Sequence, residues 1–512
     1  MKKKIIALII SGVMAVSCLT GCGEKGGGAK NSTTNIEIAY WNGGLGREWL
    51  DTLVEAFEEK HPEYSVTVNA TASASAIATA FGIPDGDTTD LYLYIQSEQT
   101  KYMEPLDDVL EATIEGESKS IGEKFQQSYL DSQVSSDGHY YMLTYGGGVI
   151  GPVYNEALFA KAGIEELPRT TKELAYVCDV LLENDIVPWC HFAPQGYWTW
   201  VNDVFFAQYC GYDYYKNNFY AAVDENGNSP SKELLTNKND GRYATLKALE
   251  EIVTADYVLP ASNTYDHATM QTKFMQGECA MMLNGSWFET EMSSQGSADG
   301  FKMMRMPVIS SIVDNLTSIS KESELTKLVA AIDSVTDGEK TIKDYKQGDD
   351  YVVDGMTVTA ADWEYVDLAR NSMANNFSSE TAFIPSYSNC KEGAKEFLKF
   401  LYSDEGYQKY LDVLGTTMPL NMSDKEADYS SLSSFGKSVF DISNNTKQFI
   451  TMEAVNRHVV YKETNARSFG TVNVIPAFTT RNTGERKTAE EFWNAYVADI
   501  EQNWDEWLQN IK

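Results

Sequence analysis

One short segment of the chain combines aromatic rings with amide and carboxylate groups. Residues 196–203 read Gly-Tyr-Trp-Thr-Trp-Val-Asn-Asp, which brings Trp198, Trp200, Asn202 and Asp203 close together along the sequence. Indole rings cover the flat C–H faces of a sugar, while amides and carboxylates pair with sugar hydroxyls that leave water. The alternative is that both tryptophans belong to the core. This mixture of groups favours a carbohydrate-binding surface.

A second group of candidate contacts lies at the ends of predicted strands. Residues 36–41 and 91–95 are mainly apolar runs that predict strands, and sequence with helical apolar spacing separates them. Alternating strands and helices indicate an α/β fold with a largely parallel sheet. In such sheets the loops that leave the carboxyl ends of the strands hold the ligand. Trp41, Asn42 and Glu98 are therefore expected at the mouth of a cleft.

The composition favours a binding protein over several other classes. The 74 acidic and 41 basic side chains give a formal charge of −33, whereas nucleic acids and anionic lipid surfaces attract lysine and arginine. We therefore expect no nucleic-acid partner. The 30 tyrosines and 10 tryptophans far outnumber the 5 histidines, which favours a binding protein over a metalloenzyme, with no metal and no cofactor. A length of 512 residues suffices for several domains or one large bilobed unit.

Residues 1–21 are expected to be a bacterial lipoprotein signal peptide. Lysines at 2–4 precede an apolar stretch at 5–16, which is too short to span about 30 Å of hydrocarbon as a helix. The Leu-Thr-Gly-Cys that ends at Cys22 resembles a lipobox, whose cysteine carries a diacylglycerol and becomes the new N-terminus. An ordinary secretory signal is the alternative. Residues 22–35 are small and polar, so we expect a flexible tether that holds the body at the extracellular face of the plasma membrane.

The remaining cysteines leave two alternatives open. Five lie in the body, at positions 178, 190, 210, 279 and 390. An odd number without a Cys-x-x-Cys motif predicts neither a disulfide framework nor a zinc site. One pair could be bridged outside the cell, or all five could be buried thiols.

Three motifs in order along the chain resemble the carbohydrate-type extracellular solute-binding proteins of ABC importers. The first is Tyr-Met-Leu-Thr-Tyr-Gly-Gly-Gly at 141–148, with Tyr-Asn-Glu-Ala-Leu-Phe following at 154–159. The second, and most specific, is Lys-Phe-Met-Gln-Gly-Glu-Cys-Ala-Met at 273–281, which runs into Asn-Gly-Ser-Trp at 284–287. The third is the pattern of a helix pair at 394–405. The first motif departs from the family pattern in having threonine at position 144, where proline is usual.

The resemblance implies an α/β, two-lobed periplasmic-binding-protein-like type II fold. Each lobe is a mainly parallel sheet flanked by helices, and the ligand cleft lies between the lobes. We expect the chain to cross between lobes near residues 146–149, 266–270 and 383–386. The residues from about 311 to 380 are expected to form an insertion. The expected division is 36–147 and 270–382 in the first lobe, and 148–269 and 383–512 in the second.

The same resemblance implies a function and further site residues. Trp287 matches a position at which the family stacks a sugar, and Tyr145 and Tyr387 lie beside expected crossings. The chain is expected to capture a sugar, in particular an oligosaccharide, and to deliver it as a monomer to an ABC permease, without catalysis. Two alternatives remain open. One is a binder of the same fold for a glycerophosphodiester, a polyamine or a peptide. The other is a lipid-anchored glycoside hydrolase, which would need a pair of carboxylates.

Overall fold

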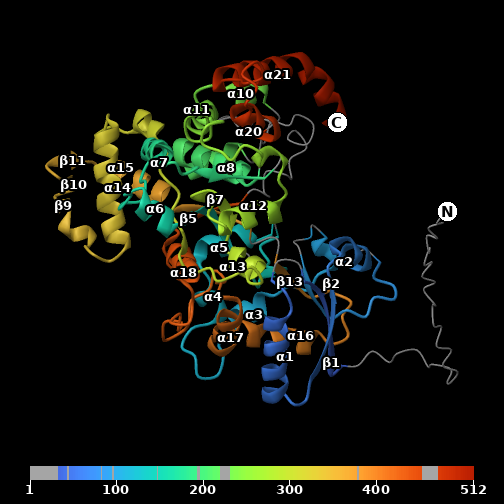
Figure 1. Cartoon of the computed structure of the whole chain (residues 1–512). Coiled ribbons are helices and arrows are strands. Elements are labelled where there is room, and N and C mark those ends of the chain that lie inside the picture. Colours follow the sequence, from blue (N-terminus) through green and yellow to red (C-terminus); the bar gives the residue numbers. More distant parts are fainter. Residues whose placement is uncertain are drawn as a thin grey trace, which may run out of the picture.

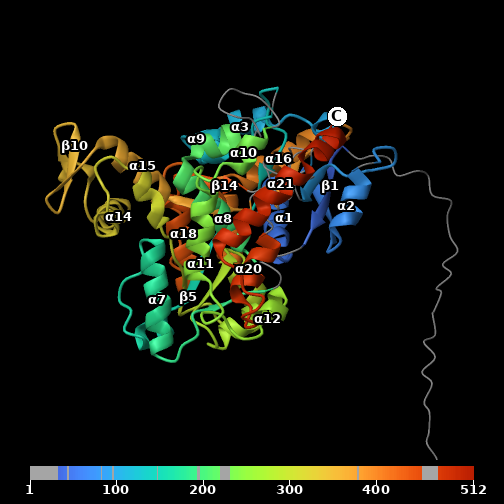
Figure 2. The same ribbon diagram turned by 90° about the horizontal axis from the view of Figure 1, so that it is seen from above.

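The computed structural model describes most of the chain beyond the expected tether. The described residues are 33–42, 45–81, 83–94, 97, 99–135, 137–146, 148–192, 196–219, 231–376, 380–451 and 471–511. The predicted signal peptide, Cys22 and Glu98 lie outside them. The described chain is a mixed α/β protein with two central sheets and many helices, which confirms the predicted fold class (Figures 1 and 2).

The first sheet contains five strands in the order β2–β1–β3–β13–β4. Strand β1 lies between β2 and β3 and runs parallel to both, whereas β13 runs antiparallel to β3 and β4. Ile36, Ile38 and Tyr40 alternate with partly buried residues along β1 and are themselves fully buried. The strands are β1 Asn35–Trp41, β2 Ser65–Thr71, β3 Leu91–Tyr94, β4 Leu143–Thr144 and β13 Thr381–Phe383.

Three helices with apolar stripes cover the first sheet. They are α1 (Glu48–Lys60), α16 (Lys391–Leu401) and α17 (Asp404–Leu414), and α1 packs against both of the others. The buried face of α1 presents Trp49, Leu50, Leu53 and Phe57, the helical spacing visible in the sequence. In α17 the Ser403 side chain accepts a hydrogen bond from the Gly406 amide and caps the first turn. These helices confirm the sequence-based predictions for their segments.

The second sheet has the order β14–β12–β5–β7–β6, and β8 also pairs with β5. Strand β5 runs antiparallel to β12, β7 and β8, whereas β12 is parallel to β14 and β6 is parallel to β7. The strands are β5 Val149–Asn155, β6 Trp189–Cys190, β7 Met281–Gly285, β8 Phe301–Met303, β12 Ser372–Asn375 and β14 Gln448–Thr451.

The antiparallel strands mark the places where the chain changes sheets. Strand β5 follows β4 of the first sheet, and β13 follows β12 of the second. We call the region between the two sheets, where the chain passes from one to the other, the junction. A strand that starts at the junction must run away from it, whereas the other strands of both sheets run towards it. The carboxyl ends of β1 and β7 therefore face the same junction, at which Trp41 ends one strand and Trp287 follows the other.

The division of the chain between lobes differs from the expected one. Strand β7 pairs with β5, which places the segment from residue 270 to β12 in the second lobe rather than the first. Strand β13, α16 and α17 pack in the first lobe, although residues from 383 onwards were expected in the second. Residues 266–270 lie at the start of α12 (His267–Met275), which contacts β6 and β7 within one lobe. The second lobe change occurs between β12 and β13, and the third lies between α17 and α18 (Ser434–Asn445).

The expected insertion forms a unit at one side of the second lobe. Helix α14 (Glu322–Thr336) leads to a small antiparallel sheet, and α15 (Ala360–Arg370) leads back to β12. Figure 1 shows this unit at the left edge of the molecule. Asp362 in α15 accepts hydrogen bonds from the amides of Thr317 and Ser318, which ties the unit to the chain before it. The small sheet consists of β9 Lys346–Gln347, β10 Asp350–Val353 and β11 Met356–Val358.

The remaining helices cover both lobes. The last helix, α21, begins after the predicted capping box, in which Thr488 and Glu491 exchange side-chain-to-backbone hydrogen bonds. It packs against α10 and α11 at the top of Figure 1.

Among the helices that the structure describes, none has the length and apolar character needed to cross a membrane. The helices not named above are α2 Ala74–Phe81, α3 Asp107–Glu111, α4 Ile121–Lys124, α5 Gln127–Gln133, α6 Glu156–Lys161, α7 Thr171–Glu183, α8 Trp198–Cys210, α9 Tyr212–Tyr214, α10 Lys232–Thr236, α11 Arg242–Ile252, α13 Phe288–Met292, α20 Thr471–Thr479 and α21 Ala489–Ile511. Short non-α turns are η1 Thr100–Tyr102, η2 Tyr215–Phe219, η3 Ser262–Thr264, η4 Ser310–Asn315 and η5 Ile342–Asp344.

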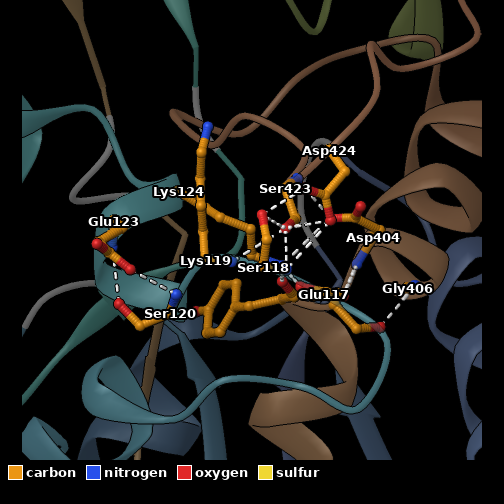
Figure 3. Close-up of polar contacts among 12 residues, drawn as sticks. Glu117, Ser118, Lys119, Ser120, Glu123, Lys124, Asp404, Gly406, Ser423 and Asp424 are labelled. Carbon is orange, nitrogen blue, oxygen red and sulfur yellow. Dashed lines mark hydrogen bonds and ion pairs between the residues drawn. The ribbon is translucent and has the colours of Figure 1, made fainter.

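A buried ionic group, which we call the Lys124 cluster, lies in the first lobe. It holds the segment between α17 and α18, in which the third lobe change occurs. The Lys124 ammonium is fully buried, pairs with Glu117 and Asp404, and donates a hydrogen bond to the Tyr402 carbonyl at 2.7 Å. Next to it Ser423 accepts a hydrogen bond from the Ser118 amide at 2.7 Å. Figure 3 shows these side chains meeting from segments far apart in the sequence. The cluster is defined as Glu117, Ser118, Lys124, Asp404 and Ser423.

Candidate functional site

Three aromatic rings of the second lobe meet beside the junction. Tyr197 and Trp200 stack with ring centroids 5.1 Å apart and an interplanar angle of 13°. Trp287 meets both rings edge-on, at 5.9 Å from Tyr197 and 6.4 Å from Trp200. We call these three side chains the aromatic cluster. Tyr197 and Trp200 are partly exposed, so the cluster presents aromatic surface to solvent.

The backbone around Trp287 explains how the indole is held. A Cβ added to Gly285 would lie 2.2 Å from the indole, so the ring can fold back over this residue only because it is glycine. The Ser286 amide donates to the Val149 carbonyl at 3.1 Å, directly after the first lobe crossing. A Cβ on Gly148 would in turn lie 1.9 Å from the Ser286 Oγ. The first crossing therefore packs closely against Ser286, the residue directly before Trp287.

A series of polar side chains from α12 and α13 lies against the aromatic cluster. The Tyr197 hydroxyl lies 3.1 Å from the His267 Nε2, and His267 begins α12. Gln271, one turn along that helix, donates to the Glu291 carboxylate at 2.7 Å. Burial raises the pKa of Tyr197 above its usual value, so the hydroxyl keeps its proton at neutral pH. Amide, imidazole and carboxylate groups can hold sugar hydroxyls, and they also fix the Tyr197 ring.

The first lobe contributes Trp41 and Tyr387 from a separate group of apolar side chains. Both are partly buried against a small cluster that includes Phe81 and Phe383. The Tyr387 hydroxyl donates to Asp87 at 2.6 Å, and burial raises the pKa of Tyr387. Trp41 thus lies at the predicted edge of the sheet, while the hydroxyl of Tyr387 is used within the first lobe.

Two amide side chains near the junction have unused hydrogen-bonding capacity. The Oδ1 atoms of Asn42 and Asn376 are buried and accept no hydrogen bond from the residues that the structure describes. Asn42 follows β1, and its backbone amide donates to the Thr71 carbonyl. Asn376 follows β12, and its backbone amide donates to the Gly148 carbonyl. Because buried amide oxygens are normally paired, these two are candidates for contacts with ligand hydroxyls.

Other residues predicted from the sequence lie in the core. Trp198 is 1% exposed and packs edge-on against Trp189, with ring centroids 5.1 Å apart. Asn202 and Asp203 are also buried in α8, where the Asn202 amide donates to the Asp203 carboxylate at 3.3 Å. Helical geometry separates them from Trp200, because the inner face of α8 packs against β12. The structure therefore brings Trp200 to the aromatic cluster and leaves Trp198, Asn202 and Asp203 behind it.

Tyr145 likewise belongs to the interior of the first lobe. It is fully buried, stacks on Trp49 at 5.4 Å and contacts Tyr40. Burial, followed by the nearby Glu380 carboxylate, raises the pKa of Tyr145 well above its usual value. In this arrangement the ring shapes the start of the first crossing rather than the aromatic cluster.

Several residues of the site escaped the sequence-based prediction. Tyr197 directly precedes Trp198 in the sequence. Because α8 begins between them, Tyr197 lies in the aromatic cluster while Trp198 is buried in the core. His267, Gln271 and Glu291 come from α12 and α13, which pack together. A polar residue directly after a buried strand was the available signal for Asn376. Within the described residues, no group of three or more His, Cys, Asp or Glu side chains is arranged to hold a metal ion.

Comparison with known proteins gives a consistent result. A sequence profile described as bacterial extracellular solute-binding protein matches residues 43–408. A probable secreted solute-binding lipoprotein from Streptomyces coelicolor is 12% identical, with a TM-score of 0.59 over 91% of this chain and 98% of that chain. RafE from Streptococcus pneumoniae is 15% identical, with a TM-score of 0.59 over 92% and 98%. At such identities these likenesses show the fold.

A third similar structure is that of maltose-bound MalE3 from T. maritima. It is 15% identical, with a TM-score of 0.56 over 91% of this chain and 99% of that chain. RafE has also been solved in complex with raffinose. No curated protein sequence matches the chain.

Proposed function

This chain belongs to the bacterial extracellular solute-binding protein family, and from that premise we propose that it captures a sugar between its lobes and delivers it to an ABC permease. The observation that carries the proposal is the aromatic cluster at the junction, where two partly exposed stacked rings stand against Trp287. Stacked rings suit the faces of a sugar, because C–H groups pack on an aromatic surface. The similar structures with bound maltose and raffinose support the choice of ligand class.

An oligosaccharide fits this arrangement better than a single sugar unit. Trp41 and Asn42 end a strand of the first lobe, whereas Trp200 and Trp287 belong to the second, so a ligand that contacts both lobes needs some length. A disaccharide has about 23 heavy atoms, and about 0.3 kcal/mol per atom gives roughly 7 kcal/mol. This corresponds to a dissociation constant near 10 μM. Two ring faces and a few paired hydroxyls are sufficient for such an affinity.

We also propose that the protein acts outside the cell, held by a lipid on Cys22. The sequence of residues 1–22 supports this, as does membership of an extracellular family. Strand β1 begins at Asn35, so about a dozen residues would separate the anchor from the folded body. The closed, ligand-bound form is the state that the permease would distinguish from the open one.

Calorimetric titration of the secreted protein tests the proposal. The panel contains maltose, raffinose and chitin oligosaccharides, with a polyamine, a glycerophosphodiester and a peptide as alternatives. We expect one glycan class to bind, and Trp287→Ala to weaken it by about 2 kcal/mol, roughly 30-fold, because the stacked rings of Tyr197 and Trp200 lose the indole that packs edge-on against both. Trp507→Ala, on the distant helix α21, is the matched control and should leave the affinity unchanged.

Two results would contradict the proposal. Binding of a charged compound alone would assign a different solute to the same family fold. Cleavage of a glycan without stable binding would favour a hydrolase, and the products would then show which bond is cut. Loss of affinity in both Trp287→Ala and Trp507→Ala would indicate a general folding defect rather than a contact.

A further inference from the structure

Two cysteines of the second lobe lie against each other beneath α12. Cys190 is the last residue of β6, and Cys279 comes just before β7. Both are buried, with 1% and 0% of their surface exposed. Their sulfur atoms are 2.7 Å apart. The pairing of Trp189 with Met281 and of Cys190 with Met282 brings the two segments together, and Cys279 reaches Cys190 from the bend that precedes β7.

Among the described residues, these two thiols make few other polar contacts. A thiol is a weak donor and a weak acceptor, so a contact between two reduced thiols stabilises the fold little. The Cys190 thiol also approaches the Met270 carbonyl at 3.6 Å, near the limit for a sulfur donor. The site is closed to solvent, which excludes a role in binding an external ligand.

The other three cysteines of the body are arranged differently. The Cys390 thiol donates to the Thr33 carbonyl at 3.1 Å, and the Cys210 thiol donates to the carbonyl of Gly211 at 3.4 Å. Cys178 is buried beside Trp189, and burial raises its pKa. The odd number of cysteines is therefore resolved into one facing pair and three separate residues.

We propose that Cys190 and Cys279 form a disulfide bond in the protein outside the cell. The inference rests on the extracellular location in the proposed function, because disulfides persist in oxidising surroundings. The oxidant is a disulfide donor such as glutathione disulfide. Its S–S bond breaks, the Cys190–Cys279 bond forms, and the two electrons and two protons of the thiols leave in two molecules of reduced glutathione.

The bond forms before folding of the second lobe buries the two sulfur atoms. The attacking species in disulfide exchange is a thiolate, and it must reach the oxidant. In the folded protein both sulfurs are buried, and burial raises the pKa of Cys279 well above its usual value. Oxidation therefore accompanies folding, after export, and the finished bond is protected from external reductants.

The bond would also steady the aromatic cluster. It closes a loop that contains α8 and α12, the helices that carry Trp200 and His267. Closing such a long loop removes many conformations of the unfolded chain. It also fixes the strand before Phe192 to the segment that leads through β7 to Trp287.

Peptide mapping of the full chain tests the proposal. The chain is refolded with glutathione disulfide, alkylated under denaturing conditions and digested. No Lys or Arg lies between positions 173 and 215, so chymotrypsin is needed to separate Cys178, Cys190 and Cys210. We expect Cys190 and Cys279 in one joined species, two hydrogen masses below the sum of its reduced peptides, while Cys178, Cys210 and Cys390 are alkylated without reduction.

A stability measurement provides the second test. Refolding with reductant should lower the midpoint of thermal unfolding of the wild-type chain by a few degrees, and should leave the Cys190→Ala/Cys279→Ala chain unchanged. Cys178→Ala is the control and should keep the sensitivity to reductant. Full alkylation of Cys190 and Cys279 after oxidative refolding would overturn the proposal, as would a bond from either one to another cysteine. If the double variant does not fold, the wild-type map decides alone. Sugar binding that survives reduction would leave the proposed function intact, so the two proposals can fail separately.

Discussion

The aromatic cluster and the Lys124 cluster both join segments that are distant in the sequence, but they differ in how their groups are satisfied. In the Lys124 cluster the ammonium is fully buried and has two carboxylates and a carbonyl as partners (Figure 3). In the aromatic cluster, Tyr197 and Trp200 stack on each other while part of each ring remains exposed. The first arrangement is complete within the protein, and the second leaves surface for a partner.

This difference separates residues that hold the fold from residues available for binding. Removing one member of a buried ion pair leaves a charge without compensation, so the loss falls on folding. Removing a partly exposed ring at the junction loses surface that a ligand can cover, so the loss falls on affinity. The same criterion separates Trp200 from Trp198, which is packed edge-on against Trp189 in the core.

The largest effect is expected for Lys124→Met. The substitution keeps an unbranched side chain, one atom shorter, but leaves the largely buried carboxylates of Glu117 and Asp404 without their cation. We expect the free energy of unfolding to fall by about 3–5 kcal/mol, measured by urea denaturation. The sugar affinity of the molecules that remain folded should not change.

Lys119→Met is the control for this experiment. Lys119 is exposed beside the same cluster, and its side chain takes no part in the cluster's ion pairs. Equal destabilisation by both variants would show that any substitution in this region lowers stability. The buried charge of Lys124 would then have no special role in holding the fold.

A smaller effect, on binding, is expected for Gly285→Ala. The added methyl group would lie 2.2 Å from the Trp287 indole, so the ring must move away from the junction. We expect sugar affinity to fall about tenfold, or roughly 1.4 kcal/mol, as measured by calorimetry. Gly484→Ala, on an exposed loop where the added Cβ would make only an ordinary contact at 3.6 Å with the Asn482 Oδ1, should bind as the wild type does. Unchanged affinity in Gly285→Ala would mean that the Trp287 ring position does not matter for the ligand.

The smallest effect is expected for Tyr197→Phe. The variant keeps the ring stacked on Trp200 but removes the hydroxyl that meets His267 at 3.1 Å. The free energy of unfolding should fall by about 1 kcal/mol, and sugar affinity should change by less than about threefold. Tyr176→Phe, at a 69% exposed position, is the control for stability. A loss of affinity as large as that of Gly285→Ala would assign the hydroxyl, not the ring, to the ligand.

Local patterns were sufficient to predict much of the framework. The spacing of Trp49, Leu50, Leu53 and Phe57 predicts α1 because these residues share one helical face. The alternation along β1 and the capping box of α21 are equally local. Each of these signals depends on residues a few positions apart, which is the range over which backbone geometry sets the contacts.

The division into lobes could not be predicted in the same way. All five residues of β7 are buried, so the sequence shows no alternation that would identify one face or one neighbour. Its partner β5 is remote in the sequence, and only the tertiary fold selects it. The candidate site shows the same limit: Trp200 could be named from residue type and Trp287 from the family motif, but the contacts of His267 and Glu291 depend on how α12 and α13 pack.

The position of β1 between two parallel neighbours has a mechanical consequence. The chain enters the first sheet at Asn35, and β1 is hydrogen-bonded on both sides to strands that run in its own direction. A pull on the N-terminal end is directed along these strands, so it loads both ladders in shear, and many hydrogen bonds must give way together. An attachment at this end therefore draws on one of the most resistant parts of the body, while the junction with its rings lies at the opposite end of the same strand.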